Sequence, residues 1–252
     1  MRWILVAGCG HTGTTITAKI IGLNSHVFGV DVETHMFDPF KIEQLPKVLK
    51  SFKKQARAEG KQVICEKTPK HILHIDYARR TLKNPSFVLC TRSPYDVIAS
   101  LAARERDPVD NKAINTGYRR YMADNIALLK QQSFEDSIVH KYEDFVQDPE
   151  ASMRRICNHA RLDFDASMLD TEANETRWFN VEGDGEAGRL KSGKTGKDHA
   201  KRRSWQVNQK IFDNRGKWKS ILNDESKQHL DGLLKRPLSR WVMKRLDYAM
   251  ES

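Results

Sequence analysis

The stretch Gly-Cys-Gly-His-Thr-Gly-Thr-Thr, residues 8–15, follows the apolar run 3–7 and decides the fold. A nearly continuous apolar run is typical of a strand that is buried on both faces, as in a parallel sheet. The glycines at 8 and 13 allow a tight loop whose backbone N–H groups point at one anion. A helix beginning at Thr14 adds its N-terminal dipole. The stretch therefore predicts a strand, a phosphate-binding loop and a helix, whereas a merely tight turn is the alternative.

The loop lacks the lysine that an ATP-binding loop carries after its last glycine. Thr14 and Thr15 occupy the positions of that lysine and of the hydroxyl residue that follows it. Threonines donate hydrogen bonds without charge, and His11 adds a ring donor or a positive charge. No apolar strand ends in an obvious metal-binding aspartate, so we expect no metal. The loop suits a group with less negative charge than a triphosphate.

Predicted strands and helices alternate along the first 160 residues. We expect strands at 2–7, 62–65, 87–90 and 138–142, and helices at 14–23, 42–59, 93–105, 111–132 and 148–159, with another starting at Thr68-Pro69. Ser-Pro-Tyr-Asp at 93–96 predicts a capping box. The alternation predicts an α/β fold of three layers, a parallel sheet flanked by helices.

The last third of the chain differs in composition. Residues 172–203 are rich in Gly, Lys and Glu and lack apolar periodicity, so we expect a mobile loop over a binding cleft. Residues 206–235 return to a helical pattern, and the tail 236–252 is expected to pack as a terminal helix. The length suits a single domain over residues 1–252.

Charge and cysteine content limit the partners and the compartment. The 252 residues carry 43 Lys and Arg against 33 Asp and Glu, a formal charge of +10, which favours an anionic partner. No apolar run reaches membrane-spanning length, and the N-terminal run is too short for a signal peptide. Four cysteines form neither a CxxC pair nor a zinc spacing, so we expect buried thiols and a cytoplasmic protein.

Two further groups of residues follow predicted strands. Arg92 ends a strand beside a helix N-terminus, where it can grip a phosphate in a fork, and Ser100 lies two turns into that helix. A structural salt bridge at Arg92 explains the residue equally well. The pair Glu66-Lys67 is by itself most simply a surface ion pair. His71 and His74, three apart on a predicted helix, could serve as bases or metal ligands, or line a cleft.

Four motifs in register resemble the sulfotransferases that use 3′-phosphoadenosine 5′-phosphosulfate (PAPS). They are GCGHTGTT at 8–15, CEKTPKHI at 65–72, CTRSPYDVIAS at 90–100 and KYEDFVQDP at 141–149. The second is similar to the acceptor-side motif of the branch that includes glycan sulfotransferases. The resemblance implies a P-loop NTPase-like sulfotransferase fold. It also implies sulfuryl transfer from PAPS to a hydroxyl, which leaves 3′-phosphoadenosine 5′-phosphate (PAP) and needs no metal.

The resemblance also implies roles for individual residues. The 5′-phosphosulfate would lie on Gly10, His11, Thr12, Gly13, Thr14 and Thr15. The donor's 3′-phosphate would be bound by Arg92 and Ser100, with Tyr142 near the adenine. A basic loop that closes over the 3′-phosphate is matched by Lys191, Ser192 and Gly193, although the tryptophan that often follows it in the family is missing.

For catalysis the resemblance implies that Glu66 is the general base and that Lys67 and His11 stabilise charge on the leaving phosphate. The family usually has lysine or arginine at the position of His11. The acceptor is left open among a glycan, a lipid and a small metabolite, with Glu33, His35 and Phe37 expected to shape its cleft. A P-loop kinase of a small molecule and a basic nucleic-acid-binding module are the competing functions.

Overall fold

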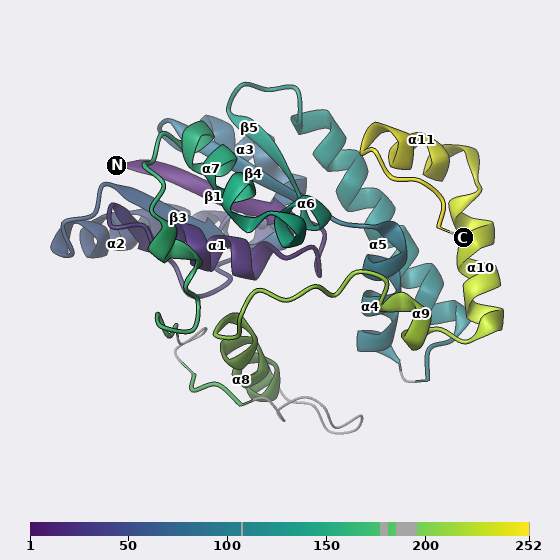
Figure 1. The fold of residues 1–252 in the computed structure, drawn as a ribbon. Helices are drawn as coiled ribbons and strands as arrows, with labels where there is room; N and C mark the ends of the chain where they lie inside the picture. The colour runs from purple at the N-terminus through teal and green to yellow at the C-terminus, as the bar shows by residue number, and fades with distance from the viewer. Residues whose placement is uncertain (107, 177–180, 185–195, 252) are drawn as a thin grey trace.

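The computed structural model describes residues 1–106, 108–176, 181–184 and 196–251, and Figure 1 shows their arrangement. Its described strands form one parallel sheet in the order β2-β3-β1-β4-β5. They are β1 Arg2–Gly8, β2 Val27–Gly29, β3 Val63–Lys67, β4 Pro85–Thr91 and β5 Ser137–Lys141. The predicted α/β fold class is confirmed. The edge strand β2 was not predicted, because three residues leave too short a pattern to recognise.

Helices cover both faces of the sheet, because the buried strands are apolar on both sides. On β1, Trp3 and Leu5 pack into one core, whereas Ile4 and Val6 pack into the other. The second core contains residues of α1 (Thr14–Gly22) and α7 (Pro149–Ala160). The first contains residues of α2 Leu45–Ala58, α3 Ile75–Thr81, α4 Pro94–Glu105 and α5 Asn111–Gln131.

Shorter elements connect these layers. Three 3₁₀ helices are described, η1 Pro39–Gln44, η2 Pro69–His74 and η3 Ala166–Leu169, together with the short helix α6 Tyr142–Gln147. The helix predicted at 42–59 is thus split between η1 and α2, and the one predicted after Thr68 begins as η2. Pro39 and Pro69 each stand at the first position of their 3₁₀ helix, where the missing N–H costs nothing.

The C-terminal helices occupy two separate places in Figure 1. They are α8 Gly196–Val207, α9 Trp218–Ile221, α10 Asp224–Leu234 and α11 Pro237–Arg245. Both α10 and α11 contact α5, and α11 forms the helix predicted for the tail. No helix in the described part of the chain is both long and apolar enough to cross a membrane.

The loop predicted at 172–203 is wrong at its C-terminal end, because α8 begins at Gly196. Ala200, Ser204 and Val207 are buried along one side of this helix, but the cations between them hide that spacing in the sequence. Buried Lys19 of α1 fixes the end of α8, since its Nζ donates to the Val207 carbonyl at 3.1 Å.

The parallel register brings the carboxyl ends of the central strands to one edge of the sheet. In β1, Val6 lies beside Lys67 of β3, and Gly8 lies beside Cys90 of β4. Thr91 pairs with Lys141 at the end of β5. In open parallel sheets this edge, next to the strand-order reversal, is where ligands bind.

Candidate active site

The first loop is held tightly by its own backbone and hydroxyl groups. Gly8 is required because a Cβ there would lie 2.1 Å from the Cys90 carbonyl oxygen. Gly13 has a φ of 86°, in the left-handed region that favours glycine. The buried Thr12 hydroxyl donates to the Cys9 carbonyl at 2.7 Å. Thr12 was predicted to bind the donor, but its hydroxyl proton is engaged with the loop backbone.

The loop ends at an uncapped helix N-terminus. Gly13 is the N-cap of α1 and has no side chain to accept from the first amides, and no acidic residue lies in the first turn. Thr14 and Thr15, both buried, form that turn. Since the first N–H groups of a helix have no intrahelical acceptor, this end can bind an anion.

His11 joins the first loop to α4. Its Nδ1 lies 2.8 Å from the Ser100 hydroxyl oxygen, and the tautomer decides which of the two donates. The structure thus brings together two residues that were predicted for different phosphates of the donor. A ligand that spans the first loop and α4 would contact both.

Arg92 is enclosed at the end of β4. Its guanidinium lies 4.3 Å from the centre of the Tyr142 ring, and its Nη2 lies 3.0 Å from Asp96 Oδ2. Nη2 also donates to the Asn214 carbonyl. Its Nε is buried and has no hydrogen-bond partner among the described residues. A buried charged donor without a partner is costly, so Arg92 is both a structural ion pair and a candidate anion ligand.

The described segment that contacts this arginine site is 212–218. The Tyr142 hydroxyl donates to the Phe212 carbonyl at 3.1 Å and accepts from the Asn214 N–H at 3.2 Å. The predicted loop residues Lys191, Ser192 and Gly193 lie outside the described residues. Sequence reasoning missed 212–218, although Arg215, Gly216 and Trp218 supply the basic residue, glycine and tryptophan sought further upstream.

The predicted capping box at 93–96 is wrong. The Ser93 hydroxyl donates to Glu251 Oε1 at 2.8 Å and does not cap α4. The carboxylate of Asp96 accepts from the N–H groups of Gly216 at 3.0 Å and Trp218 at 3.1 Å. Both side chains find partners in distant segments of the chain, which a local motif cannot reveal.

Glu66, the predicted base, is completely buried, with 0% exposure. Its Oε1 accepts from both hydroxyls of Thr34 and Thr68 at 2.7 Å, and its Oε2 lies 3.1 Å from His71 Nδ1. The Phe37 N–H donates to His71 Nε2, so Nδ1 carries the proton that faces Glu66. Burial raises the pKa of Glu66, but His71 and the two threonines outweigh it and lower the pKa. The carboxylate is ionised and surrounded by donors.

Glu33 is the carboxylate of this cluster that reaches solvent, with 28% of its side chain exposed. Its Oε1 lies 2.5 Å from Nζ of Lys67, whose side chain is only 1% exposed. Burial raises the pKa of Glu33, but Lys67 outweighs it and lowers the pKa. Burial lowers the pKa of Lys67 to about 8 despite Glu33. The pair combines an accessible carboxylate with a buried ammonium at the end of β3.

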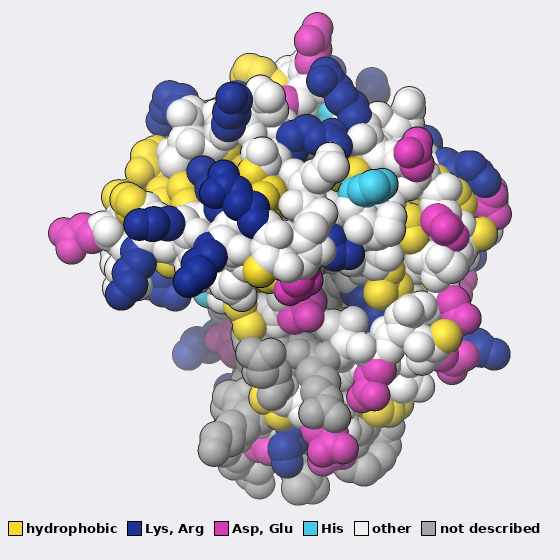
Figure 2. All heavy atoms as spheres, turned by 90° about the vertical axis from the view of Figure 1, so that its left-hand side faces the viewer, with side chains coloured by type: hydrophobic (Ala, Val, Ile, Leu, Met, Phe, Trp, Pro, Cys, Tyr) yellow, Lys and Arg dark blue, Asp and Glu magenta, His cyan; other side chains and the backbone are white. Residues whose placement is uncertain are grey.

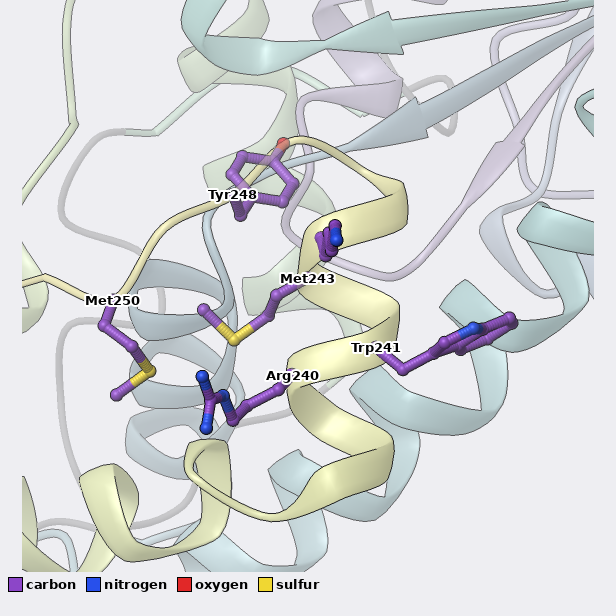
Figure 3. A pocket seen from close by; sticks show the side chains of 6 residues that line it. Arg240, Trp241, Met243, Tyr248 and Met250 are labelled. Carbon is purple, nitrogen blue, oxygen red and sulfur yellow. The ribbon is translucent and has the colours of Figure 1, made fainter.

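A surface hollow of about 330 Å³ lies elsewhere, between α11 and the chain after it (Figure 3). Trp241, Met243, Tyr248 and Met250 line it together with the cations Arg240 and Lys244, and none of these described lining residues is a carboxylate. It therefore offers cations and apolar surface but no base. The strand-end cluster remains the candidate active site.

Comparison with known proteins decides the family. A sequence model described as the sulfotransferase family matches residues 35–166, just over half of the chain. The chain belongs to the sulfotransferase family. It is an enzyme that transfers a sulfuryl group, and the matched residues include Glu66, Lys67, Arg92, Ser100 and Tyr142.

Solved sulfotransferase structures share the fold at low sequence identity. The sulfotransferase domain from the curacin biosynthetic pathway is 14% identical, with 98% of each chain covered and a TM-score of 0.64. The domain from the Synechococcus PCC 7002 olefin synthase is also 14% identical, with 100% of this chain and 95% of that chain covered and a TM-score of 0.65. Mouse sulfotransferase SULT7A1, complexed with PAP, is 12% identical, with 96% and 88% covered and a TM-score of 0.52. Comparison with curated proteins gave no match.

Proposed function

We propose that this sulfotransferase takes the sulfuryl group from PAPS and transfers it to a hydroxyl of a polar acceptor. The observation that carries the donor assignment is Arg92, whose buried Nε has no hydrogen-bond partner among the described residues and whose guanidinium lies over the Tyr142 ring. PAPS differs from other sulfuryl or phosphoryl donors by a 3′-phosphate, and a buried arginine edge suits that dianion. The PAP-bound mouse sulfotransferase supports the same donor.

The first loop suits the other end of the donor. Gly13, Thr14 and Thr15 present the free N–H groups of α1 to the 5′-phosphosulfate, and the dipole of α1 favours its negative charge. His11 and Ser100, 2.8 Å apart, would both contact the phosphates from the α4 side. The donor supplies a sulfuryl group that is already activated by its bond to phosphate. The residues of the loop bind and orient it.

For the acceptor side we propose that Glu33 accepts the proton and that Glu66 positions its surroundings. Each Glu66 oxygen already accepts hydrogen bonds, and no part of the residue is exposed. Glu33 is partly exposed and ionised, so a hydroxyl can approach it. Glu66 fixes the backbone beside it by accepting from Thr34. A positioned base of this kind contributes about 10²–10⁴-fold to a rate.

The bonds formed and broken in the transfer, and the proton released, are assigned to groups of the donor, the acceptor and the protein. One bond forms between the acceptor oxygen and sulfur, and one breaks between sulfur and the 5′-phosphate oxygen, which keeps the electron pair. The acceptor proton passes to Glu33. Lys67, 2.5 Å from Glu33, holds that carboxylate in place and stabilises negative charge nearby. Positioning and electrostatics of this kind account for catalysis in the related phosphoryl transfers.

The cations of α2 lie toward the amino ends of the strands, since this helix runs into β3 at Val63, so they favour an acidic acceptor such as a charged glycan only at long range. Figure 2 shows Lys and Arg side chains gathered on the side of the molecule where α2 lies. Lys50, Lys53, Lys54 and Arg57 line a shallow hollow of about 550 Å³ there. The segment before α2 contacts the Glu33 region, since Lys41 Nζ donates to the Thr34 carbonyl at 3.0 Å.

The direct test is calorimetric binding of PAP beside adenosine 5′-monophosphate, which lacks the 3′-phosphate. We expect PAP to bind about 100-fold more tightly, the contribution of two charge-assisted hydrogen bonds. Equal affinities would remove the donor assignment. A PAPS-dependent screen of hydroxylated compounds, read by the mass gain of one sulfate, identifies the acceptor.

A further inference from the structure

Arg120 of α5 lies against the first loop. None of the four sequence motifs includes this arginine. A Cβ added to Gly10 would lie 3.0 Å from Arg120 Nη2 and 3.5 Å from its Cζ. Gly10 does not have a positive φ, so the space taken by the guanidinium, rather than backbone strain, is what favours glycine there. The loop backbone and this side chain are therefore in near-contact.

One end of Arg120 is held loosely by a buried carboxylate. Its Nε lies 3.6 Å from Asp124 Oδ2, beyond hydrogen-bond distance, and each of these two buried atoms lacks a hydrogen-bond partner among the described residues. Burial raises the pKa of Asp124, and the charge of Arg120 opposes that rise. A purely structural pair at this depth would be expected to satisfy both atoms.

The other end of Arg120 is open. Its side chain is 37% exposed, whereas that of Asp124 is 5% exposed. The Nε of the guanidinium is thus the atom nearest Asp124 and its Nη2 the atom nearest the Cβ position of Gly10, while more than a third of the side chain is exposed. This is the geometry of a cation that is aimed by a buried acid and available to a ligand on the loop.

We propose that Arg120 contacts the sulfuryl oxygens of the donor and supplies the positive charge that the loop itself lacks. The inference rests on the proposed function. Residues 8–15 contain no lysine or arginine, so a fixed cation beside the loop must come from another element. Arginine stays charged at all physiological pH values and carries several donors in a plane. During transfer its N–H groups stabilise the negative sulfuryl oxygens, and the electron pair and the proton move as described above.

The sulfuryl group is present in PAPS and absent from PAP, so calorimetry with both ligands tests the contact without knowledge of the acceptor. For Arg120→Ala we expect PAPS affinity to fall about tenfold or more and PAP affinity to change less than about twofold. Release of labelled sulfate from PAPS to water should fall by about 10²–10³-fold. Arg120→Lys, which keeps the charge but not the fork, should lie between.

Two further variants separate this role from folding and from general charge. Arg119→Ala removes the neighbouring, exposed arginine of α5 and should leave both affinities unchanged. Gly10→Ala keeps every charge but pushes the guanidinium away, so it should lower PAPS affinity by a larger factor than PAP affinity, which also depends on this loop. Thermal unfolding of each variant shows whether it is folded. If Arg120→Ala does not fold, the affinities of Arg120→Lys for PAPS and PAP test the proposal.

The outcomes are distinct. If the wild type fails to bind PAP, the proposed function fails and this contact fails with it. If PAP binds and Arg120→Ala leaves PAPS affinity and sulfate release within about twofold of the wild type, only the sulfuryl contact is overturned. Equal losses of PAP and PAPS affinity would also overturn it, because they would place Arg120 on a phosphate.

Discussion

Glu66 and Glu33 lie at the same edge of the sheet, yet one is sealed and the other is open. Glu66 belongs to strand β3 and is surrounded by Thr34, Thr68 and His71. Glu33 lies on an irregular segment, pairs with Lys67 and keeps 28% of its side chain exposed. A strand places a residue rigidly, whereas a loop at the strand ends can meet a substrate. In our proposal Glu66, which matches the motif, therefore positions the surrounding residues, and Glu33 accepts the proton.

The largest effect should come from Glu33→Gln, which keeps the size of the side chain but cannot accept the proton. We expect sulfuryl transfer to fall by about 10²–10⁴-fold with unchanged PAP affinity. The measurement is initial rate with the acceptor found in the PAPS-dependent screen, together with calorimetry of PAP. The roles of the two carboxylates would be reversed if Glu66→Gln lost transfer by about 10²–10⁴-fold at normal stability while Glu33→Gln stayed active.

The next effect concerns the donor side, where we compare two arginines. The guanidinium of Arg79 is fully hydrogen-bonded, whereas Arg92 keeps an Nε without a partner among the described residues. Arg92→Ala removes an Nε that has no hydrogen-bond partner in the described part of the chain, and it should lower PAP affinity about 100-fold. Affinity for adenosine 5′-monophosphate should stay within about threefold. Arg79→Ala is the matched control, because Arg79 is an arginine fully engaged with Asp136 on the far end of the strands. A uniform loss for both nucleotides in Arg92→Ala would contradict a 3′-phosphate contact.

Glu66→Gln should act on stability, because it turns an acceptor for three side chains into a group that also donates. The amide would face the Nδ1–H of His71 and leave buried donors unsatisfied. We expect the free energy of unfolding to fall by about 1–3 kcal/mol. Urea unfolding of Glu66→Gln and Glu33→Gln, compared side by side, measures it. The sealed carboxylate should lose clearly more stability than the open one.

The central strands and the first loop could be predicted from the sequence, because each depends on neighbours in the chain. The run before Gly8 reads as a buried strand, and Arg92 follows another. The burial of Glu66 could not be predicted, because Thr34 and His71 come from separate segments. Glu33 was expected only to shape a cleft, and nothing in the residues around it marks the ion pair with Lys67.

Other features were missed for the same reason. Arg120 meets the first loop only because α5 crosses beside it, 110 residues later in the chain. The segment 212–218 reaches Tyr142 and Asp96 through backbone groups, so these contacts cannot be predicted from the sequence even though Arg215, Gly216 and Trp218 mark the segment. Composition predicted a loop across α8, because the cations that lie between its buried residues in the sequence hide the spacing of those residues.

The Glu33–Lys67 pair should also give the enzyme a pH limit. The pKa of Lys67 is lowered to about 8 by burial, and that of Glu33 is lowered by Lys67, so both are charged between pH 5 and 7. Transfer should therefore fall about tenfold per pH unit as the pH rises above about 8. Lys67→Arg should move this limb upward, because arginine keeps its charge. A rate profile that is flat up to pH 10 would exclude a role for the ammonium.

The same shift affects stability with the opposite sign. Between pH 8 and the higher pKa of an exposed lysine, the unfolded chain binds more protons at this residue than the folded chain. The contribution of Lys67 to the free energy of unfolding therefore rises with pH over the window in which activity falls. Parallel loss of activity and of stability above pH 8 would point to general unfolding instead.

The smallest effect concerns Ser93. It tests whether the Ser93 hydroxyl bonds to Glu251, far away in the sequence, instead of capping α4. A cap on α4 and a bond to Glu251 would each contribute about 1 kcal/mol, so Ser93→Ala alone does not distinguish them. A double-mutant cycle with Glu251→Ala does. Because the Ser93 hydroxyl donates to Glu251 Oε1 at 2.8 Å, we expect a coupling of about 0.5–1.5 kcal/mol in urea unfolding. A coupling of zero would mean that the bond between Ser93 and Glu251 contributes nothing to stability in solution.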